Sequence, residues 1–315
     1  MSGDHSDGSA SLPAPDQAAA PAPATTEPIS VAFLGLGRMG APMAARLALS
    51  GHPLSVWNRS PRPESTPSGA TVAVTPAQAA ATAEVIITMV ADGAALLAIL
   101  DGPEGVLAGA HPGSVLIDMS TVGPAITLAV AECCRAQGLA FLDAPVSGSV
   151  PAATSGTLLT MVGGPAEVLE RARPVLSAMT AAQIHLGDTG TGATMKLALN
   201  LMLAVTNETI AETLTIAERA GIDREAAYDV LAGGALAAPY VNYKRAAFAD
   251  PQRAPVAFSV ELMNKDVSLA LEMARGLGLD PPAGQAAAEV LQRSLTAGLG
   301  QSDLVNVIQT LQGAA

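Results

Sequence analysis

Short apolar runs alternate with longer, Ala-rich segments between Ile29 and Gly187. The Ala-rich segments are long enough to form helices, as at 39–50, 76–82 and 124–137. This alternation is typical of βαβ units, so we predict an α/β fold with a mostly parallel, doubly wound sheet. The apolar runs predict strands at residues 29–35, 54–57, 70–74, 85–90, 115–119, 140–145, 157–163 and 183–187.

After Gly187 the pattern becomes helical throughout, with Gly or Pro between several segments. The predicted helices are 190–220, 223–232, 259–276, 282–298 and 302–312. Residues 1–27 are rich in Ala, Pro, Ser and Thr without any apolar period, which predicts a disordered tail. The expected organisation is therefore a tail (1–27), an α/β domain (28–189) and an all-helical domain (190–315).

The chain carries 28 acidic and 16 basic residues, a net charge of −12. This balance argues against nucleic acid or an anionic membrane as a partner, so local groups must hold any anionic ligand. The four histidines form no ligand-like cluster, and we expect no metal site. The tail lacks the basic start and apolar run of a signal peptide, and no later run suits a membrane span. We therefore expect a cytoplasmic protein.

A glycine-rich segment, Gly35-Leu36-Gly37-Arg38-Met39-Gly40, follows the first predicted strand and begins a helix. In this context the first glycine allows a tight turn, the second lets a pyrophosphate approach the backbone, and the third lets helix and strand pack closely. The helix N-terminus then faces the phosphates. We predict a dinucleotide site here; the alternative is a glycine-rich turn that binds no ligand.

The residues after the second predicted strand indicate which dinucleotide is bound. A site for NAD usually places Asp or Glu there, about 20 residues after the glycines. This chain has Asn58, Arg59 and Ser60 instead, with Arg62 close behind. A guanidinium can bind a 2′-phosphate that an acid would repel, so we predict that NADP(H) is preferred over NAD(H). The alternative is that these arginines only solvate a surface loop.

Two further strand ends carry polar residues that are unusual in a core. Asp118-Met-Ser120-Thr121 ends one strand, and Asp143-Ala-Pro-Val-Ser147-Gly148-Ser149 ends another. The carboxyl ends of parallel strands are where ligands lie in open sheets. Ser147, Gly148 and Ser149 could present hydroxyl and backbone N–H groups to a carboxylate. The alternative is that both motifs are ordinary helix caps.

Lys196 and Asn200 stand four residues apart in an otherwise largely apolar helix that three glycines precede. This spacing places both polar groups on one helix face. A cation and a carboxamide that point together into an apolar region need partners, and a polar substrate could supply them. The alternative for Lys196 is a surface lysine that reaches solvent. Tyr240, Tyr243, Lys244 and Arg245 form another polar cluster, which either packs between helices or lines the substrate pocket.

These blocks together resemble, in order and spacing, the β-hydroxyacid dehydrogenases of the 3-hydroxyisobutyrate dehydrogenase-like group. The resemblance runs from about residue 29 to the C-terminus and rests on five motifs in register. They are Gly35-Leu-Gly-Arg-Met-Gly-Ala-Pro-Met, Asp118-Met-Ser-Thr, Asp143-Ala-Pro-Val-Ser-Gly-Ser, Gly190-Thr-Gly-Ala-Thr-Met-Lys-Leu-Ala-Leu-Asn and Lys265-Asp266.

The resemblance implies an NADP-binding Rossmann domain at 28–189 and a helical substrate and dimerisation domain at 190–315, usually in a homodimer or homotetramer. It implies hydride transfer between a nicotinamide and a short hydroxy acid, with Lys196 and Asn200 as the catalytic pair. It places the substrate carboxylate at Ser147 and Gly148, and Ser120 and Thr121 near the nicotinamide. The expected substrate-binding set is Ser120, Ser147, Gly148 and Ser149. The expected cofactor set is Gly35, Leu36, Gly37, Arg38, Met39, Gly40, Asn58, Arg59, Ser60, Met89, Val90, Thr121 and Lys265.

One departure concerns the substrate loop. Many members continue Val-Ser-Gly-Gly, whereas this chain has Ser149-Val150-Pro151 after Gly148, which resembles the glyoxylate and succinic semialdehyde reductase branch. Three rivals are considered. Imine reductases typically carry Asp or Tyr in place of Lys196 and lack the Asp143 block, and 6-phosphogluconate dehydrogenases are much longer. A non-catalytic NADP-binding protein would need neither Lys196 nor Asn200.

Overall fold

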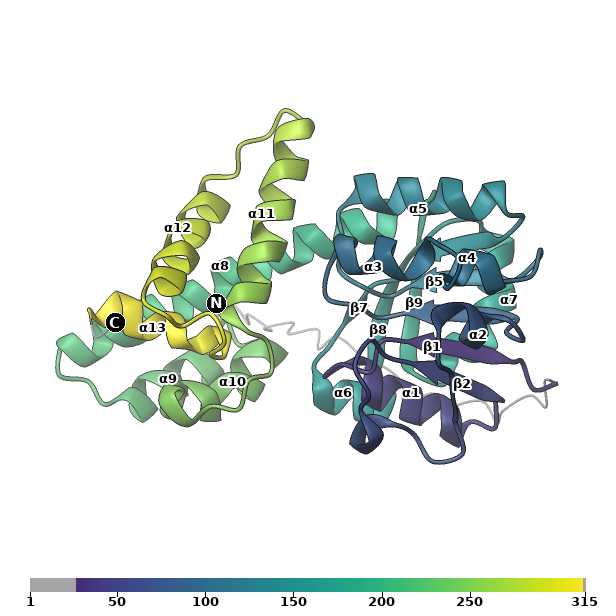
Figure 1. Cartoon of the computed structure of the whole chain (residues 1–315). Helices are drawn as coiled ribbons and strands as arrows, with labels where there is room; N and C mark the ends of the chain where they lie inside the picture. Colours follow the sequence, from purple (N-terminus) through teal and green to yellow (C-terminus); the bar gives the residue numbers. More distant parts are fainter. Residues whose placement is uncertain (1–26, 314–315) are drawn as a thin grey trace, which may run out of the picture.

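The computed structural model describes residues 27–313. The predicted disordered tail therefore lies, apart from Glu27, outside the described residues. Within them the chain forms an α/β half followed by a helical half, and one long helix leads from the first into the second (Figure 1). The predicted α/β architecture with a helical C-terminal region is confirmed.

A mixed but mostly parallel sheet is the centre of the α/β half. Its spatial order is β3-β2-β1-β4-β5-β6-β8-β7, and β9 also pairs with β8. Strands β1 to β6 pair in parallel, whereas β8 runs antiparallel to β6 and β7. Within residues 27–313 the nine strands are β1 (Val31–Leu34), β2 (Leu54–Trp57), β3 (Thr71–Val72), β4 (Val85–Thr88), β5 (Val115–Asp118), β6 (Ala140–Asp143), β7 (Val146–Ser147), β8 (Leu158–Gly163) and β9 (Thr180–Gly187).

Helices cover both faces of the sheet, which explains why its central strands are apolar at every position up to the polar residue that ends each of β4, β5 and β6. In β1, Val31 and Phe33 face one core with α1, α6 and α7, while Ala32 and Leu34 face the other with α2 to α5. The helices are α1 (Gly40–Leu49), α2 (Pro76–Ala80), α3 (Gly93–Leu100), α4 (Val106–Gly109), α5 (Pro124–Ala136), α6 (Val150–Ser155) and α7 (Ala166–Ser177), with a 3-10 turn η1 (Pro63–Ser65).

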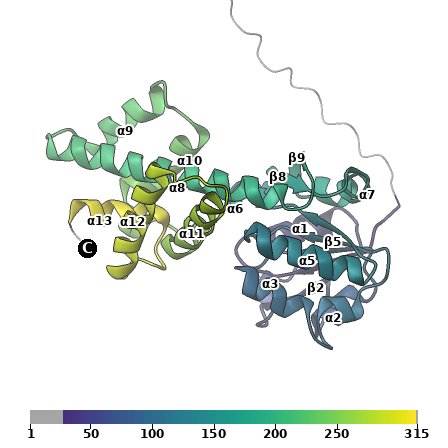
Figure 2. The ribbon, with the colours of Figure 1, turned by 90° about the horizontal axis from the view of Figure 1, so that it is seen from above.

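The helical half is built around α8, the 29-residue helix that leaves the sheet (Figures 1 and 2). Its far turns pack with the other helices around buried Leu214, Phe248 and Met263. Neither α8 nor any other helix in residues 27–313 has an apolar stretch that could cross a bilayer. The elements are α8 (Thr191–Arg219), α9 (Arg224–Gly233), α10 (Pro239–Ala249), η2 (Pro251–Arg253), α11 (Val260–Gly276), α12 (Pro282–Thr296), η3 (Leu304–Asn306) and α13 (Val307–Gln312).

The structure differs from the predicted elements in several places. The expected strand 140–145 ends at Asp143, and β7 begins only at Val146, because Pro145 between them has no N–H to donate to a ladder. The predicted helix 302–312 divides into η3 and α13. The ranges named from the pattern do not include β7 or the helices α3, α4, α6, α7 and α10.

Candidate active site

The glycines between β1 and α1 serve different purposes. Gly35 has a φ of 108°, and a Cβ there would collide with the Met89 carbonyl oxygen. A Cβ on Gly40 would collide with the Gly35 carbonyl, so this glycine lets α1 pack on the turn. A Cβ on Gly37, which is exposed, would meet no atom within 4 Å. The fold therefore explains Gly35 and Gly40, while Gly37 leaves the backbone open to an external group such as a pyrophosphate.

Asn58 joins the glycine loop to the loop after β2. Its Oδ1 accepts a hydrogen bond from Leu36 N at 2.8 Å, and its Nδ2 donates to Ser60 O at 2.8 Å. The carboxamide is thus occupied by the protein, whereas Arg59 and Ser60 beside it are exposed. The structure brings the two halves of the expected cofactor set together, although Asn58 holds the loops and does not extend outward.

Most cationic side chains of this acidic chain are already used. All 16 lysines and arginines lie within residues 27–313, and twelve of them donate a hydrogen bond or form an ion pair there. The four without such a partner in this part of the chain are Arg38, Arg59, Arg62 and Lys196. Arg38 lies on the glycine loop, and Arg59 and Arg62 lie on the loop that Asn58 ties to it. The three free guanidiniums therefore lie on the glycine loop and on the segment that is hydrogen-bonded to it.

The polar ends of β4, β5 and β6 form one row across the sheet. Thr88, Asp118 and Asp143 are register partners, and Thr88 Oγ1 donates to Asp118 Oδ1 at 2.7 Å. Burial raises the pKa of Asp118, while hydrogen bonds from Ser120 and Thr88 oppose that rise. Ser120 is itself buried, and its Oγ accepts from Val90 N at 2.9 Å. Ser120 thus fixes the half-buried segment after β4, which includes Met89 and Val90, beside the glycine loop.

Asp143 contacts the start of the helix that carries Lys196. Its Oδ1 accepts from Gly190 N and its Oδ2 from Ala193 N, both at 2.8 Å. Burial raises the pKa of this carboxyl, and those backbone donors oppose the rise. The N-terminus of α8 is therefore attached directly to the end of β6.

The substrate loop leaves its hydroxyl groups available. Ser147 pairs with Leu159 of β8, and Gly148 follows with a φ of 132°. Ser149 occupies the N-cap position of α6, yet its side chain caps no backbone N–H of that helix. Neither serine hydroxyl has a hydrogen-bond partner in residues 27–313. This arrangement differs from the ordinary helix caps that were the alternative explanation.

Lys196 is half-buried at the beginning of α8 and has a distinct electrostatic environment. Burial lowers its pKa to about 8; nearby Lys265 also lowers this pKa, and Asp266 raises it. Its helical neighbour Asn200 is 2% exposed and donates through Nδ2 to Asp266 Oδ2 at 2.6 Å. Asn200 therefore holds Asp266 in this structure, and among the described residues its carboxamide forms no hydrogen bond with the Lys196 side chain.

A chain of polar contacts links this group to the α/β half. Lys265 Nζ lies 2.7 Å from Asp266 Oδ1 and donates to Thr121 O at 2.7 Å. Lys265 and Thr121, which were expected near the cofactor, are thus brought together across the two halves. Asp266 was not among the residues expected at the site. A signal was present, because Asp266 shares the buried face of α11 with Met263, Val267 and Ala270.

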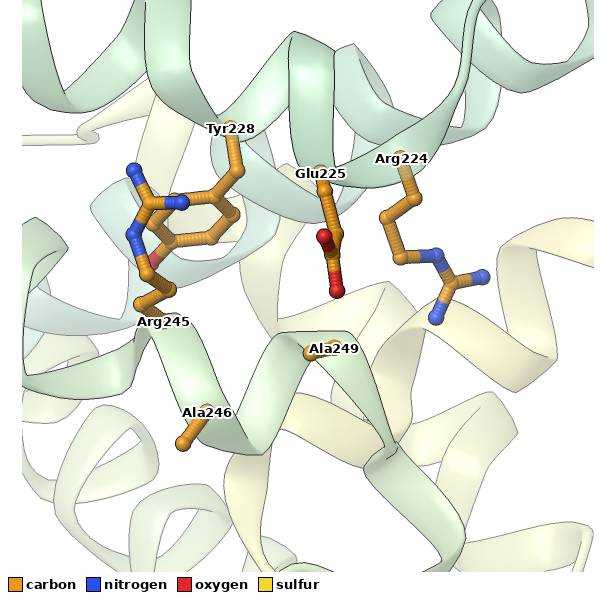
Figure 3. A pocket seen from close by; sticks show the side chains of 6 residues that line it. All are labelled: Arg224, Glu225, Tyr228, Arg245, Ala246 and Ala249. Atoms are coloured by element: carbon orange, nitrogen blue, oxygen red, sulfur yellow. The ribbon is translucent and has the colours of Figure 1, made fainter.

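In the polar cluster of α10, Tyr240 and Lys244 contact neighbouring elements, whereas Tyr243 is 53% exposed. Tyr240 OH donates to Asn207 Oδ1 at 2.8 Å, and Lys244 forms a buried ion pair with Asp303. Arg245 alone of this cluster lines a cavity of about 330 Å³ between α9 and α10. Figure 3 shows its guanidinium beside the Tyr228 ring, with Arg224 on the far side of Glu225. None of the residues that line this cavity belongs to the expected site.

Comparison with known proteins adds family matches over both halves. Residues 30–187 match the NAD binding domain of 6-phosphogluconate dehydrogenase. Residues 190–311 match the family described as NAD-binding of NADP-dependent 3-hydroxyisobutyrate dehydrogenase. The cofactor class expected from the glycine loop, NAD or NADP, is therefore confirmed at the level of the family.

Individual relatives agree with these matches. The 3-sulfolactaldehyde reductase of Escherichia coli is 35% identical and aligns over 91% of this chain and 97% of its own. The chloroplastic glyoxylate/succinic semialdehyde reductase 2 of Arabidopsis thaliana is 32% identical over 91% of this chain and 80% of its own. The structure of 3-hydroxyisobutyrate dehydrogenase from Mycobacterium tuberculosis with L-serine has a TM-score of 0.78 at 34% identity, and covers 90% of this chain and 99% of that one.

Proposed function

This chain belongs to the β-hydroxyacid dehydrogenase family, and we propose that it is an NADP(H)-dependent enzyme that interconverts a short β-hydroxy acid and its aldehyde or keto acid. The observation that carries the proposal is the set of unpartnered cations. In a chain of net charge −12, the free cationic side chains of residues 27–313 are Arg38, Arg59 and Arg62 around the glycine loop and Lys196 at the start of α8. These are the two places where a phosphorylated cofactor and a developing oxyanion need positive charge.

Lys196 is suited to proton transfer to a carbonyl oxygen. The bound nicotinamide cofactor would supply the hydride, and negative charge would then build on the substrate oxygen. Lys196 would stabilise that charge and donate the proton, or accept it in the reverse reaction. A pKa of about 8 keeps both protonation states accessible near neutral pH. Asn200 and Asp266 would set the environment of the ammonium group through their hydrogen bond.

The free hydroxyls of Ser147 and Ser149 and the exposed backbone at Gly148 would hold the substrate carboxylate. Holding this group fixes the carbonyl relative to Lys196, and such orientation contributes as much as proton transfer. The relatives point to small aldehyde acids, since their names include glyoxylate, succinic semialdehyde and sulfolactaldehyde.

The test of this function is a panel assay. Glyoxylate, succinic semialdehyde, tartronate semialdehyde, methylmalonate semialdehyde and 3-sulfolactaldehyde are offered with NADPH, and the corresponding hydroxy acids with NADP. We expect saturable turnover with at least one aldehyde acid and none with its methyl-ester analogue, which lacks the anionic carboxylate or sulfonate. Cyclic imines are included as a control, and turnover of imines alone would replace this proposal with imine reduction. NADPH binding without any turnover would favour the non-catalytic alternative.

The rate should depend on pH with opposite signs in the two directions. Reduction needs protonated Lys196, so kcat should be level below about pH 7 and fall about tenfold per unit well above pH 8. Oxidation needs the neutral amine, so its kcat should rise through the same range and then level off. The measurement is kcat against pH at saturating cofactor in each direction. A reduction rate that rises from pH 7 to 9 contradicts the assignment.

The cofactor preference should reverse when Arg59 is replaced by Asp. Arg59→Asp removes a cation that can bind the 2′-phosphate and adds an acid that can accept hydrogen bonds from the ribose hydroxyls of NADH. We expect kcat/KM for NADPH to fall about 100-fold relative to that for NADH, since charged hydrogen bonds contribute about 1.5–3 kcal/mol. Arg46→Asp on the adjacent helix, where Arg46 contacts Ala178 O, is the matched charge control. An unchanged ratio for Arg59→Asp contradicts NADP preference.

A further inference from the structure

We propose that Asp143 is a positioning residue for the reaction: its carboxylate fixes the first turn of α8 on the end of β6 and so sets where Lys196 stands. The inference rests on the proposed function of Lys196. Within residues 27–313, Asp143 forms no hydrogen bond with the glycine loop or with the hydroxyls of Ser147 and Ser149, which are expected to bind the substrate.

Two backbone N–H groups at the start of α8 face the Asp143 carboxylate. Gly190 is the N-cap residue of α8 with a φ of 95°, so its N–H and that of Ala193 in the first turn converge on one point. Asp143 occupies that point and gives one carboxylate oxygen to each N–H at 2.8 Å. A carboxylate at a helix N-terminus also interacts favourably with the helix dipole.

The surroundings of Asp143 leave its carboxylate little freedom to move. Asp143 is 1% exposed, and two glycines enclose it. A Cβ on Gly163 would lie 2.6 Å from Oδ1, and one on Gly192 would lie 2.9 Å from Oδ2. The absence of side chains at Gly163 and Gly192 therefore makes room for this carboxylate, which could not shift without moving the backbone of β8 or α8.

Asp143 lies between the two parts of the expected site, which are the cofactor side and Lys196. It is the register partner of Asp118, which hydrogen-bonds Thr88 and the Ser120 N–H on the cofactor side. Lys196 follows Ala193 by three residues, a rise of about 4.5 Å along the helix. Lys196 thus stands within one helical turn of this attachment. A displacement of about 1 Å in a reacting group can cost about 100-fold in rate.

The test compares the wild type with Asp143→Asn, which keeps the size of the side chain but turns one acceptor into a donor facing a backbone N–H. Lysines are reductively methylated with ¹³C-formaldehyde, and the titration of Lys196 is followed by NMR without cofactor. The chain has only three lysines, which makes assignment practical. We expect the pKa of the Lys196 amine, lowered by burial, to rise by about 0.5 or more when the helix start loosens and water reaches it.

Kinetics give the second measurement. We expect Asp143→Asn to bind NADPH within about threefold of the wild type and to lose about 10- to 100-fold in kcat. The primary isotope effect with cofactor deuterated at the transferred position should increase as hydride transfer becomes slower than product release. Mere loss of folded enzyme would lower kcat without changing KM or the isotope effect. If Asp143→Asn does not fold, Asp143→Ser takes its place, because serine is also a preferred N-cap residue.

Asp223→Asn is the matched control, since Asp223 caps α9 by accepting from Glu225 N and Ala226 N. It should leave both the Lys196 titration and the isotope effect unchanged. An Asp143 variant with an unshifted Lys196 titration and wild-type kcat overturns the inference. If the wild type reduces no substrate of the panel, the proposed function fails, and the Lys196 titration still decides whether Asp143 positions this lysine.

Discussion

Lys196→Ala is expected to lower kcat for carbonyl reduction by about 100- to 10,000-fold while NADPH binding stays within a few-fold of the wild type. The ammonium group of Lys196 has no hydrogen bond or ion pair in residues 27–313, so its removal breaks no side-chain contact of that kind. Burial already penalises its charge, which is why its pKa is lowered to about 8. The loss should therefore appear in turnover, with no decrease in the midpoint of thermal unfolding. Steady-state kinetics and NADPH fluorescence titration measure the two effects.

Two companion variants separate the parts of this effect. Lys196→Met keeps most of the aliphatic stem, and it should be as inactive as Lys196→Ala if the amine is what matters. Lys196→Arg keeps a positive charge that does not titrate in the working range. It should restore some stabilisation of the oxyanion but abolish the pH dependence near 8. Turnover of Lys196→Met within tenfold of the wild type would remove Lys196 from the mechanism.

The α/β architecture could be predicted because burial on both faces makes the central strands apolar at consecutive positions. Val31 to Leu34 illustrate this pattern, with side chains divided between two cores. Helix α7 was missed although Val168, Leu169, Ala172 and Val175 form an apolar stripe, because Pro174 suggests a helix end. Helix α10 was missed because Tyr, Asn, Lys and Arg interrupt its apolar positions, and its lysine is buried only through an ion pair with Asp303.

The expected site residues also divide into those that local sequence patterns indicate and those that depend on contacts between distant segments. Glycine spacing and a lysine with an asparagine four residues later are local patterns, so Gly37, Lys196 and Asn200 could be selected from the sequence. Asp143 and Asp266 act across 50 and 66 residues, through Ala193 and Asn200. A sequence does not state which strand end lies under which helix. The structure supplies these contacts, and with them the connection between the sheet and the lysine.

The largest expected effect on stability comes from Lys244, in the helical half. Its Nζ lies 2.7 Å from Asp303 Oδ1, and the two side chains are 4% and 0% exposed. Lys244→Met leaves Asp303 with backbone N–H partners alone, including Ala257 at 2.8 Å, and without a counter-charge. Removing one partner of a buried ion pair typically costs about 3–5 kcal/mol. At about 2–4 °C for each kcal/mol of lost stability, we expect the midpoint of thermal unfolding to fall by about 6–20 °C.

This cost belongs to the unpaired carboxylate more than to the lost attraction, and a second substitution can show it. Asp303→Asn in the Lys244→Met background removes the charge and should recover at least half of the lost stability. The exposed pair of Arg245 and Asp229 provides the matched control, because Arg245→Met should cost no more than about 1 kcal/mol. Asp303 also pairs with Ser259 at the start of α11, the helix that carries Lys265 and Asp266. Lys244→Met should therefore lower the temperature at which turnover is lost along with the unfolding midpoint. If Lys244→Met alone is as stable as Arg245→Met, the backbone donors are sufficient to stabilise the Asp303 carboxylate.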